Sequence, residues 1–265
     1  MIGILSVILC ALATVGIWMH IHALSTGNPA ARIKFLAPWG LMLIAMAAMA
    51  STRIFTQHGI DFEFYNSLLA TAFIICALLF LASLFKQVEH LGLIVLPVVL
   101  ITIGLNLAFL KPGTQSSFSA GMQTHIITSM IAFSILGLAA VQAILLFFQD
   151  KALKQHSNVS MFRGIPSLHE SETTLFQSIT LGVAILTIAL VSGFIYLEDI
   201  FAQHLAHKTL LSSLAWVVFV VLLWGRSQFG WRGSTAIRWS LSGFSFLILA
   251  YFGSKFVLEL VLYNA

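Results

Sequence analysis

Histidines are the side chains of this sequence that could carry chemistry. There are nine of them beside only nine acidic residues, and imidazole is the commonest protein ligand of metal ions and a frequent ligand of haem iron. His125 is the strongest candidate because it opens the apolar segment GMQTHIITSMIAFSILGLAA, where we expect a membrane surface. Ser129 and Ala132 follow on the same helix face, and their small side chains would let a flat ligand approach. The alternative is an interfacial histidine that hydrogen-bonds to a neighbouring loop.

Two further pairs of histidines are close in sequence. His204 and His207 lie three residues apart in EDIFAQHLAHKT. If that segment is helical, they share a face and could bind a metal ion, or one could supply a second axial ligand. The alternative is two solvated loop histidines. His20 and His22 are two residues apart and point to different sides of a helix, so we interpret them as polar residues near a membrane boundary.

The elements that position these histidines are predicted to be membrane-spanning helices. Of the 265 residues, 59% are hydrophobic and 8% are charged, whereas a soluble domain has about 25% charged residues. A spanning helix needs about 20 mainly apolar residues. Eight such runs occur, at residues 2–24, 34–52, 66–85, 91–110, 122–148, 175–197, 209–225 and 236–260. We therefore predict an all-α, polytopic transmembrane helix bundle of about eight spans, forming a single integral membrane domain over residues 1–265.

The basic residues predict the orientation of this bundle, because an excess of Lys and Arg marks cytoplasmic loops. One set of loops holds Arg32, Lys34, Lys86, Lys151, Lys154, Arg163, Arg226, Arg232 and Arg238. The opposite set holds Arg53, Lys111, Lys208 and Lys255. The first set should be cytoplasmic, so both termini should lie outside, together with His125, His204 and His207.

Several function classes are disfavoured. Cys10 and Cys76 lie inside apolar runs, and no CxxC or CxxCH occurs, so we expect neither thiol–disulfide chemistry nor covalent haem attachment. No P-loop, GxSxG or HExxH motif is present, and no run of five like charges suggests a nucleic-acid partner. The spans hold almost no acidic residues, which argues against an ion-coupled transporter and ranks a small-solute permease last. The sequence favours a non-enzymatic membrane protein.

Five segments, in their order and spacing, carry a family resemblance. They are GMQTHIITSMIAFSIL at 121–136, LFQSITLGVAILTIALVSGFIY at 175–196, HKTLLSSLAWVVFVVLLWGR at 207–226, GWRG at 230–233 and AYFGS at 250–254. Together they resemble the CcsA-type cytochrome c assembly family, and within it the YpjD-like branch of bacterial inner-membrane proteins, whose pattern the HemX-type proteins share. The resemblance covers nearly the whole chain, with an assembly-like core at about residues 60–260, and is strongest from Gly121 to Gly253.

The resemblance implies haem handling. In cytochrome c synthetases of this class, a tryptophan-rich WWD loop holds haem between two outer histidines, two further histidines lie within the membrane, and the haem is joined to a CxxCH apocytochrome. His125 matches the first outer histidine. The segment that corresponds to the WWD loop, residues 198–208, contains no tryptophan. The other three ligand positions fall near Leu262 or Tyr263, near Trp224 and near Met46.

These departures shape the expected function. The resemblance implies a haem-handling, cytochrome c biogenesis-type inner-membrane protein that is accessory rather than a synthetase. Haem would bind through His125, with His204 or His207 as a substitute second ligand, and an apocytochrome or another membrane protein would be the partner. The alternative is an accessory or structural subunit of another membrane complex, such as a transporter, without bound haem.

Overall fold

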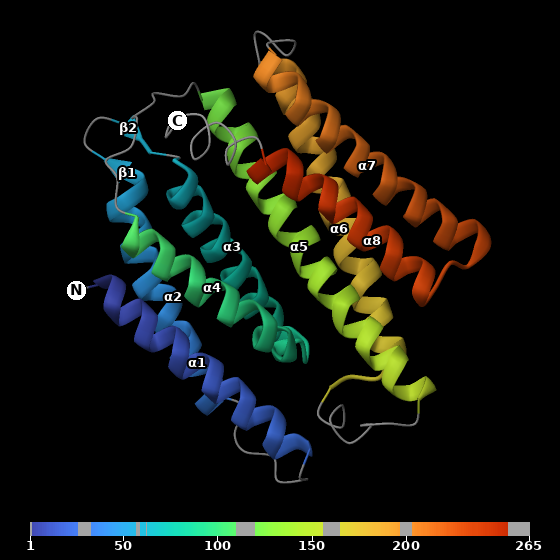
Figure 1. Ribbon diagram of the computed structural model, residues 1–265, viewed down its shortest axis with the longest axis horizontal. Coiled ribbons are helices and arrows are strands. Elements are labelled where there is room, and N and C mark those ends of the chain that lie inside the picture. The colour runs from blue at the N-terminus through green and yellow to red at the C-terminus, as the bar shows by residue number, and fades with distance from the viewer. Residues whose placement is uncertain are drawn as a thin grey trace. The chain divides into compact units, whose positions relative to one another are not determined.

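The computed structural model describes residues 2–25, 33–56, 59–61, 63–109, 120–155, 165–196 and 203–253 (Figure 1). Within these ranges, eight helices are long and apolar enough to cross a membrane. They correspond to α1 (Ile2–Ser25), α2 (Ile33–Ile54), α3 (Phe64–Phe85), α4 (Gly92–Ala108), α5 (Ala120–Lys154), α6 (Leu168–Tyr196), α7 (Gln203–Phe229) and α8 (Ser234–Ile248). The spans of α4 and α8 also include the short turns next to them, from Glu89 and up to Gly253. The predicted all-α fold with about eight spans is confirmed.

Short elements complete the described chain. A 3-10 turn, η1 (Glu89–Leu91), precedes α4, and a π-helical segment, η3 (Leu249–Gly253), continues α8. Between α2 and α3, the two-residue strands β1 (Phe55–Thr56) and β2 (Gly59–Ile60) pair antiparallel. This small pair reverses the chain and leaves the all-α class unchanged.

Three helices run well beyond the apolar segments that predicted them. Helix α5 continues past residue 148 to Lys154, and α7 extends from Gln203 to Phe229 rather than over 209–225. Helix α6 begins at Leu168, directly after Ser167, rather than at residue 175. The spacing of Ser167 and Glu170 is that of a capping box, which marks a helix start more closely than hydropathy does. Hydropathy locates the part of a helix that lies in lipid, while polar turns extend the helix into water.

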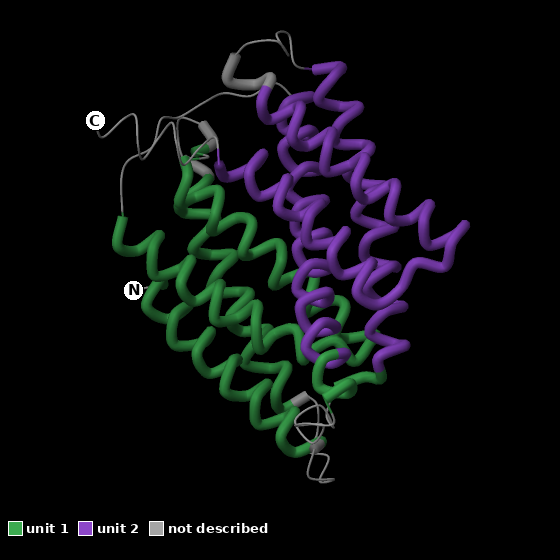
Figure 2. The backbone as a smooth tube through the Cα atoms, turned by 45° about the vertical axis from the view of Figure 1, so that its right-hand side comes forward, with its two compact units in different colours: residues 1–117, 151–167 green, residues 118–150, 168–265 purple. Residues whose placement is uncertain are grey.

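The chain divides into two compact units, shown in separate colours in Figure 2. Unit 1 comprises residues 1–117 and 151–167, and unit 2 comprises residues 118–150 and 168–265. The single membrane domain over 1–265 stays a prediction.

Unit 1 is built around α1 and α4. Helix α1 packs against α2 and α4, and α3 packs against α2 and α4. Trp39 of α2 and Leu96 of α4 are fully buried in its core. A buried amide pair joins α3 to α4, where Asn106 Nδ2 donates to Asn66 Oδ1 at 3.0 Å. Such a bond is favourable in lipid because water offers no alternative partner.

Helices α5, α6, α7 and α8 all contribute side chains to one continuous apolar core in unit 2. Leu136, Ile179, Phe219 and Ile237 represent the four helices in this core. Trp216 lies in the middle of α7. Its indole Nε1 donates to Thr187 Oγ1 at 2.8 Å, which links α7 to α6.

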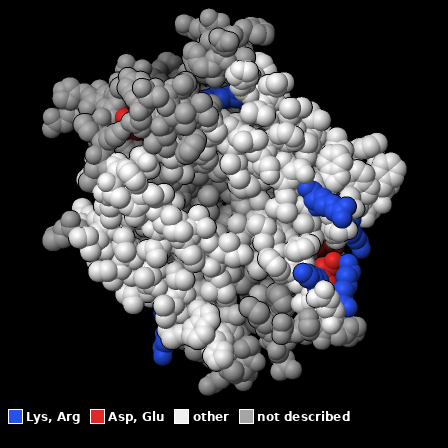
Figure 3. Space-filling model, in the orientation of Figure 1, with Lys and Arg blue, Asp and Glu red and all other residues white. Residues whose placement is uncertain are grey.

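The outer surface is largely apolar. Large hydrophobic side chains are exposed along every spanning helix, and the face in Figure 3 shows few charged groups. A soluble monomer rarely exposes such extensive apolar area. Helices with satisfied backbones and apolar exteriors are what a bilayer requires.

Candidate functional site

His125 lies on the second turn of α5, and its imidazole is tied to α6. The ring atom Nδ1 is 2.9 Å from the carbonyl oxygen of Ala189 and 3.3 Å from Ser192 Oγ. Ser192 Oγ itself donates to the same Ala189 carbonyl at 2.8 Å. The alternative of a hydrogen-bonded interfacial histidine stays open, but both partners of Nδ1 belong to the spanning helix α6 and not to a loop.

This arrangement assigns the proton of the neutral imidazole. A carbonyl oxygen can only accept, and the Ser192 hydroxyl has already given its proton to Ala189. Nδ1 must therefore carry the hydrogen and donate it. Nε2 of His125 then keeps its lone pair. Histidine ligands of metals commonly donate their other ring N–H to a carbonyl, which fixes the ring and raises the basicity of the ligating nitrogen.

Small and aromatic residues form the surroundings of this ring. Gly121 lies one helical turn before His125, and a side chain there would overlap the ring of Tyr196. Tyr196 in turn lies one turn after Ser192 on α6 and is half exposed. The imidazole is half-buried, so it is held on one side by α6 and remains partly accessible.

The expectation that Ala132 leaves room for a flat ligand is wrong. Ala132 is completely buried and belongs to the apolar core of unit 2. The adjacent Phe133 ring contacts Phe244, Tyr251 and Phe252 at centroid distances of 5.2, 5.1 and 5.5 Å. Closer to His125, Ser129 is half-buried and Thr124 is exposed.

His204 and His207 both belong to the first turns of α7, so the condition that their segment be helical is met. His207 is exposed, while the side chain of His204 falls outside the described part. No hydrogen bond or ring contact joins His207 to His125 among the residues the structure describes. Over the same residues, no group of three or more His, Cys, Asp or Glu could hold a metal ion. The position expected for a second outer histidine, Leu262 or Tyr263, lies outside the described residues.

Unit 1 contains a buried ionisable pair that sequence reasoning missed. His20 Nε2 of α1 lies 3.6 Å from Glu89 Oε1 of η1, and both side chains are over 90% buried. The ring of Phe35 lies against His20 at 4.9 Å, and His90 is buried beside Glu89 in the chain. His22 is exposed, as the two-residue spacing predicted. The predicted orientation already placed residues 20 and 89 on one side of the membrane, but only the packing of α1 against η1 and α4 pairs them.

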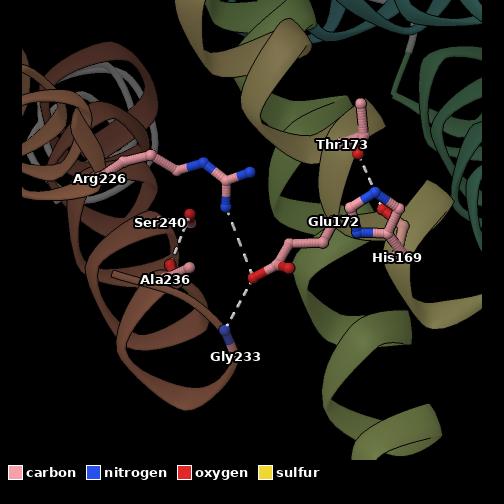
Figure 4. Close-up of polar contacts among 7 residues, drawn as sticks. All are labelled: His169, Glu172, Thr173, Arg226, Gly233, Ala236 and Ser240. Atoms are coloured by element: carbon pink, nitrogen blue, oxygen red, sulfur yellow. Dashed lines mark hydrogen bonds and ion pairs between the residues drawn. The ribbon is translucent and has the colours of Figure 1, made fainter. Parts of the chain in front are cut away.

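Unit 2 contains a second polar cluster, shown in Figure 4. Glu172 of α6 accepts a hydrogen bond from the backbone N–H of Gly233 at 2.9 Å, and Arg226 Nη1 lies 3.7 Å from the same oxygen. The Arg226 guanidinium also lies 3.9 Å above the Phe176 ring. Gly233 has φ of 54°, which favours glycine. One carboxylate therefore holds α7 and the start of α8 against α6.

The sequence of the whole chain can be compared with known families. The family model described as "Cytochrome C assembly protein" matches residues 35–262. The chain belongs to the cytochrome c assembly protein family. The expected family is thereby confirmed, and the match begins before the core expected at about residue 60.

Individual proteins are also similar in sequence to this chain. The inner membrane protein YpjD of Escherichia coli strain K12 is 34% identical over 175 residues, 64% of this chain and 66% of YpjD. An uncharacterized 28.8 kDa protein of Azospirillum brasilense is 29% identical over 233 residues, 84% and 86% of the two chains. Protein HemX of Brevibacillus brevis is 25% identical over 132 residues, 49% and 48%.

These comparisons also locate the protein. The matched region spans just under two thirds of the length of YpjD. No solved structure matches the chain. With a relative named for the inner membrane and eight helices suited to spanning, this family member is a multi-pass protein of the bacterial inner membrane.

Proposed function

We propose that this protein handles haem during cytochrome c assembly and that His125 is an axial ligand of the haem iron. The observation that carries the proposal is the hydrogen bond between His125 Nδ1 and the Ala189 carbonyl. It fixes the tautomer that leaves Nε2 as a lone-pair donor. Membership of a family described by cytochrome c assembly supports the same conclusion, since cytochromes c carry haem.

The residues around His125 fit this role. The imidazole is half-buried, and its hydrogen bonds to α6 both involve Nδ1. Within the described residues, Nε2 forms no hydrogen bond. Ala189 and Ser192 orient the ring, and Tyr196 closes the side next to Gly121. Bound haem would supply an iron that a neutral imidazole nitrogen can bind. The protein's own contribution is to bind that iron at Nε2 and to hold the Nδ1 proton on α6.

The proposed role is accessory rather than that of a synthetase. Residues 198–208, which correspond to the family's haem-binding loop, contain no tryptophan. His207 or His204, on the first turns of α7, would be the second iron ligand. Both termini and this site would face the outside, and the partner would be an apocytochrome or another membrane protein.

The test is the absorbance spectrum of the detergent-purified protein, oxidised and reduced, after expression with added haem precursor. The wild-type protein should show a haem Soret band, and His125→Ala should lose most of it. His169→Ala is the matched control, because His169 is exposed on α6 of the same unit and should keep the band. His207→Ala should shift the spectrum if His207 is the second ligand.

Imidazole rescue separates ligation from a structural role. Free imidazole added to His125→Gly should restore a low-spin spectrum, because the ligand nitrogen is replaced although the tether to α6 is not. A colourless wild-type protein under haem-rich expression would reject the proposal and favour a haem-free accessory subunit of another complex. An unchanged spectrum in His125→Ala would reject His125 as the ligand.

A further inference from the structure

The hairpin between α7 and α8 presents arginines and aromatic rings together. We call this surface the hairpin patch, made up of Arg232, Arg238, Trp224, Phe229, Trp231 and Trp239. All six residues lie in unit 2, within the last turns of α7, the connecting turn and the first turns of α8. On the face shown in Figure 3, the main group of basic side chains lies on the side where Figure 1 draws this hairpin.

The rings of the patch form a connected series. The centroids of Trp224 and Phe229 are 5.4 Å apart, those of Phe229 and Trp231 are 6.3 Å apart, and those of Trp231 and Trp239 are 5.4 Å apart. Trp224 and Phe229 remain 55% and 64% exposed. The Trp231 ring packs closely against Gly225 and leaves no room for a side chain at that position. Exposed aromatic rings at the end of a span are typical of the headgroup level of a bilayer.

The arginines of the patch are not used within the protein. Arg226 nearby is engaged by Glu172 and by the Phe176 ring. Arg232 and Arg238 are exposed, and neither forms an ion pair or hydrogen bond with the described parts of the chain. Two arginines without an ion pair in the described chain therefore lie next to Trp231 and Trp239 in the sequence. Arginine is well suited to phosphate because its planar guanidinium can donate two parallel hydrogen bonds.

We propose that the hairpin patch is a binding site for the headgroup of an anionic phospholipid. Arg232 and Arg238 bind the phosphate, and the exposed rings of Trp224 and Phe229 cover the glycerol and upper acyl region. Charge alone would suit a free phosphate ion equally well. A free phosphate would leave the two exposed rings in water, whereas a lipid covers them, so the combined surface favours a lipid. This site is independent of His125 and of haem.

The experiment uses the full-length, detergent-purified protein and follows its thermal unfolding during titration with dioctanoyl-phosphatidylglycerol. Wild-type protein should be stabilised in a saturable manner, and the same concentrations of dioctanoyl-phosphatidylcholine or inorganic phosphate should have little effect. An arginine near an anionic membrane surface contributes about a fivefold factor in affinity. Arg232→Gln combined with Arg238→Gln should therefore raise the apparent dissociation constant for phosphatidylglycerol roughly 25-fold.

The matched control removes two positive charges elsewhere. Lys34 and Lys86 are exposed residues of unit 1, and Lys34→Gln with Lys86→Gln should leave the dissociation constant within about twofold. Arg238→Gln alone should raise it about fivefold, which covers the case in which the double variant fails to fold. Phe229→Ser should also weaken phosphatidylglycerol binding, since it removes an exposed ring without changing charge.

Four outcomes would overturn the proposal. They are no stabilisation of the wild type by phosphatidylglycerol, equal stabilisation by phosphatidylcholine, equal stabilisation by inorganic phosphate, and equal loss in the lysine control. Equal stabilisation by inorganic phosphate would identify an ion site instead of a lipid site. Loss in the lysine control would show a general effect of net charge.

Discussion

Removal of the Glu172 carboxylate should release the α7–α8 hairpin from α6. Glu172→Ala deletes the acceptor for the Gly233 N–H at 2.9 Å and the partner of Arg226 at 3.7 Å. A hydrogen bond to a charged group contributes about 1.5–3 kcal/mol. The Arg226 side chain is 26% exposed, so the ion pair adds no more than about 1 kcal/mol. The expected loss in the free energy of unfolding is about 2–4 kcal/mol.

The assay is reversible unfolding in mixed micelles by increasing sodium dodecyl sulfate, followed by tryptophan fluorescence. Glu172→Gln keeps an oxygen that can accept from Gly233 but loses the charge, so it should cost about half as much as Glu172→Ala. Gln228→Ala, at an exposed position of the same hairpin, should change the free energy of unfolding by less than about 0.5 kcal/mol.

A double-mutant cycle isolates the ion pair. Arg226→Met removes the guanidinium from both Glu172 and the Phe176 ring. Combined with Glu172→Ala, it should reveal a coupling energy of about 0.5–1 kcal/mol. Destabilisation by Glu172→Ala no larger than that of Gln228→Ala would refute the reasoning, because the carboxylate would then not hold the hairpin.

Two further changes test packing in the two units by the same unfolding assay. Gly225→Ala should destabilise by about 1–2 kcal/mol, because the new methyl group meets the Trp231 ring; a gain in stability, as helix propensity alone would predict, would show that the ring does not pack there. His20→Ala should destabilise by about 1–3 kcal/mol, since it removes a buried imidazole that packs against the Phe35 ring and lies 3.6 Å from Glu89 Oε1. His22→Ala, at an exposed position of the same helix, should cost under about 0.5 kcal/mol, and equal costs for the two histidines would contradict the pairing.

The sequence determined where the membrane helices lie. A chain segment in lipid must satisfy its own backbone hydrogen bonds, so an apolar run of sufficient length is already a helix. Helix α1 was predicted at 2–24 and occupies Ile2–Ser25, and α3 was predicted at 66–85 and occupies Phe64–Phe85. The same local signals could not show how far α5 continues past its apolar run, because water tolerates either a helix or a loop there.

Tertiary structure alone decided what the polar side chains do. The residue type and place of His125 made it a candidate ligand, but its proton is assigned by Ala189 and Ser192, 64 and 67 residues away. Likewise, the sequence does not pair His20 with Glu89, because the packing of α1 brings them together, and it does not show that the core of unit 2 covers Ala132. Hydropathy is a sum over neighbours in sequence, whereas hydrogen bonds and burial depend on neighbours in space. The spans of this protein could therefore be predicted from its sequence, and the state of each polar group within them could not.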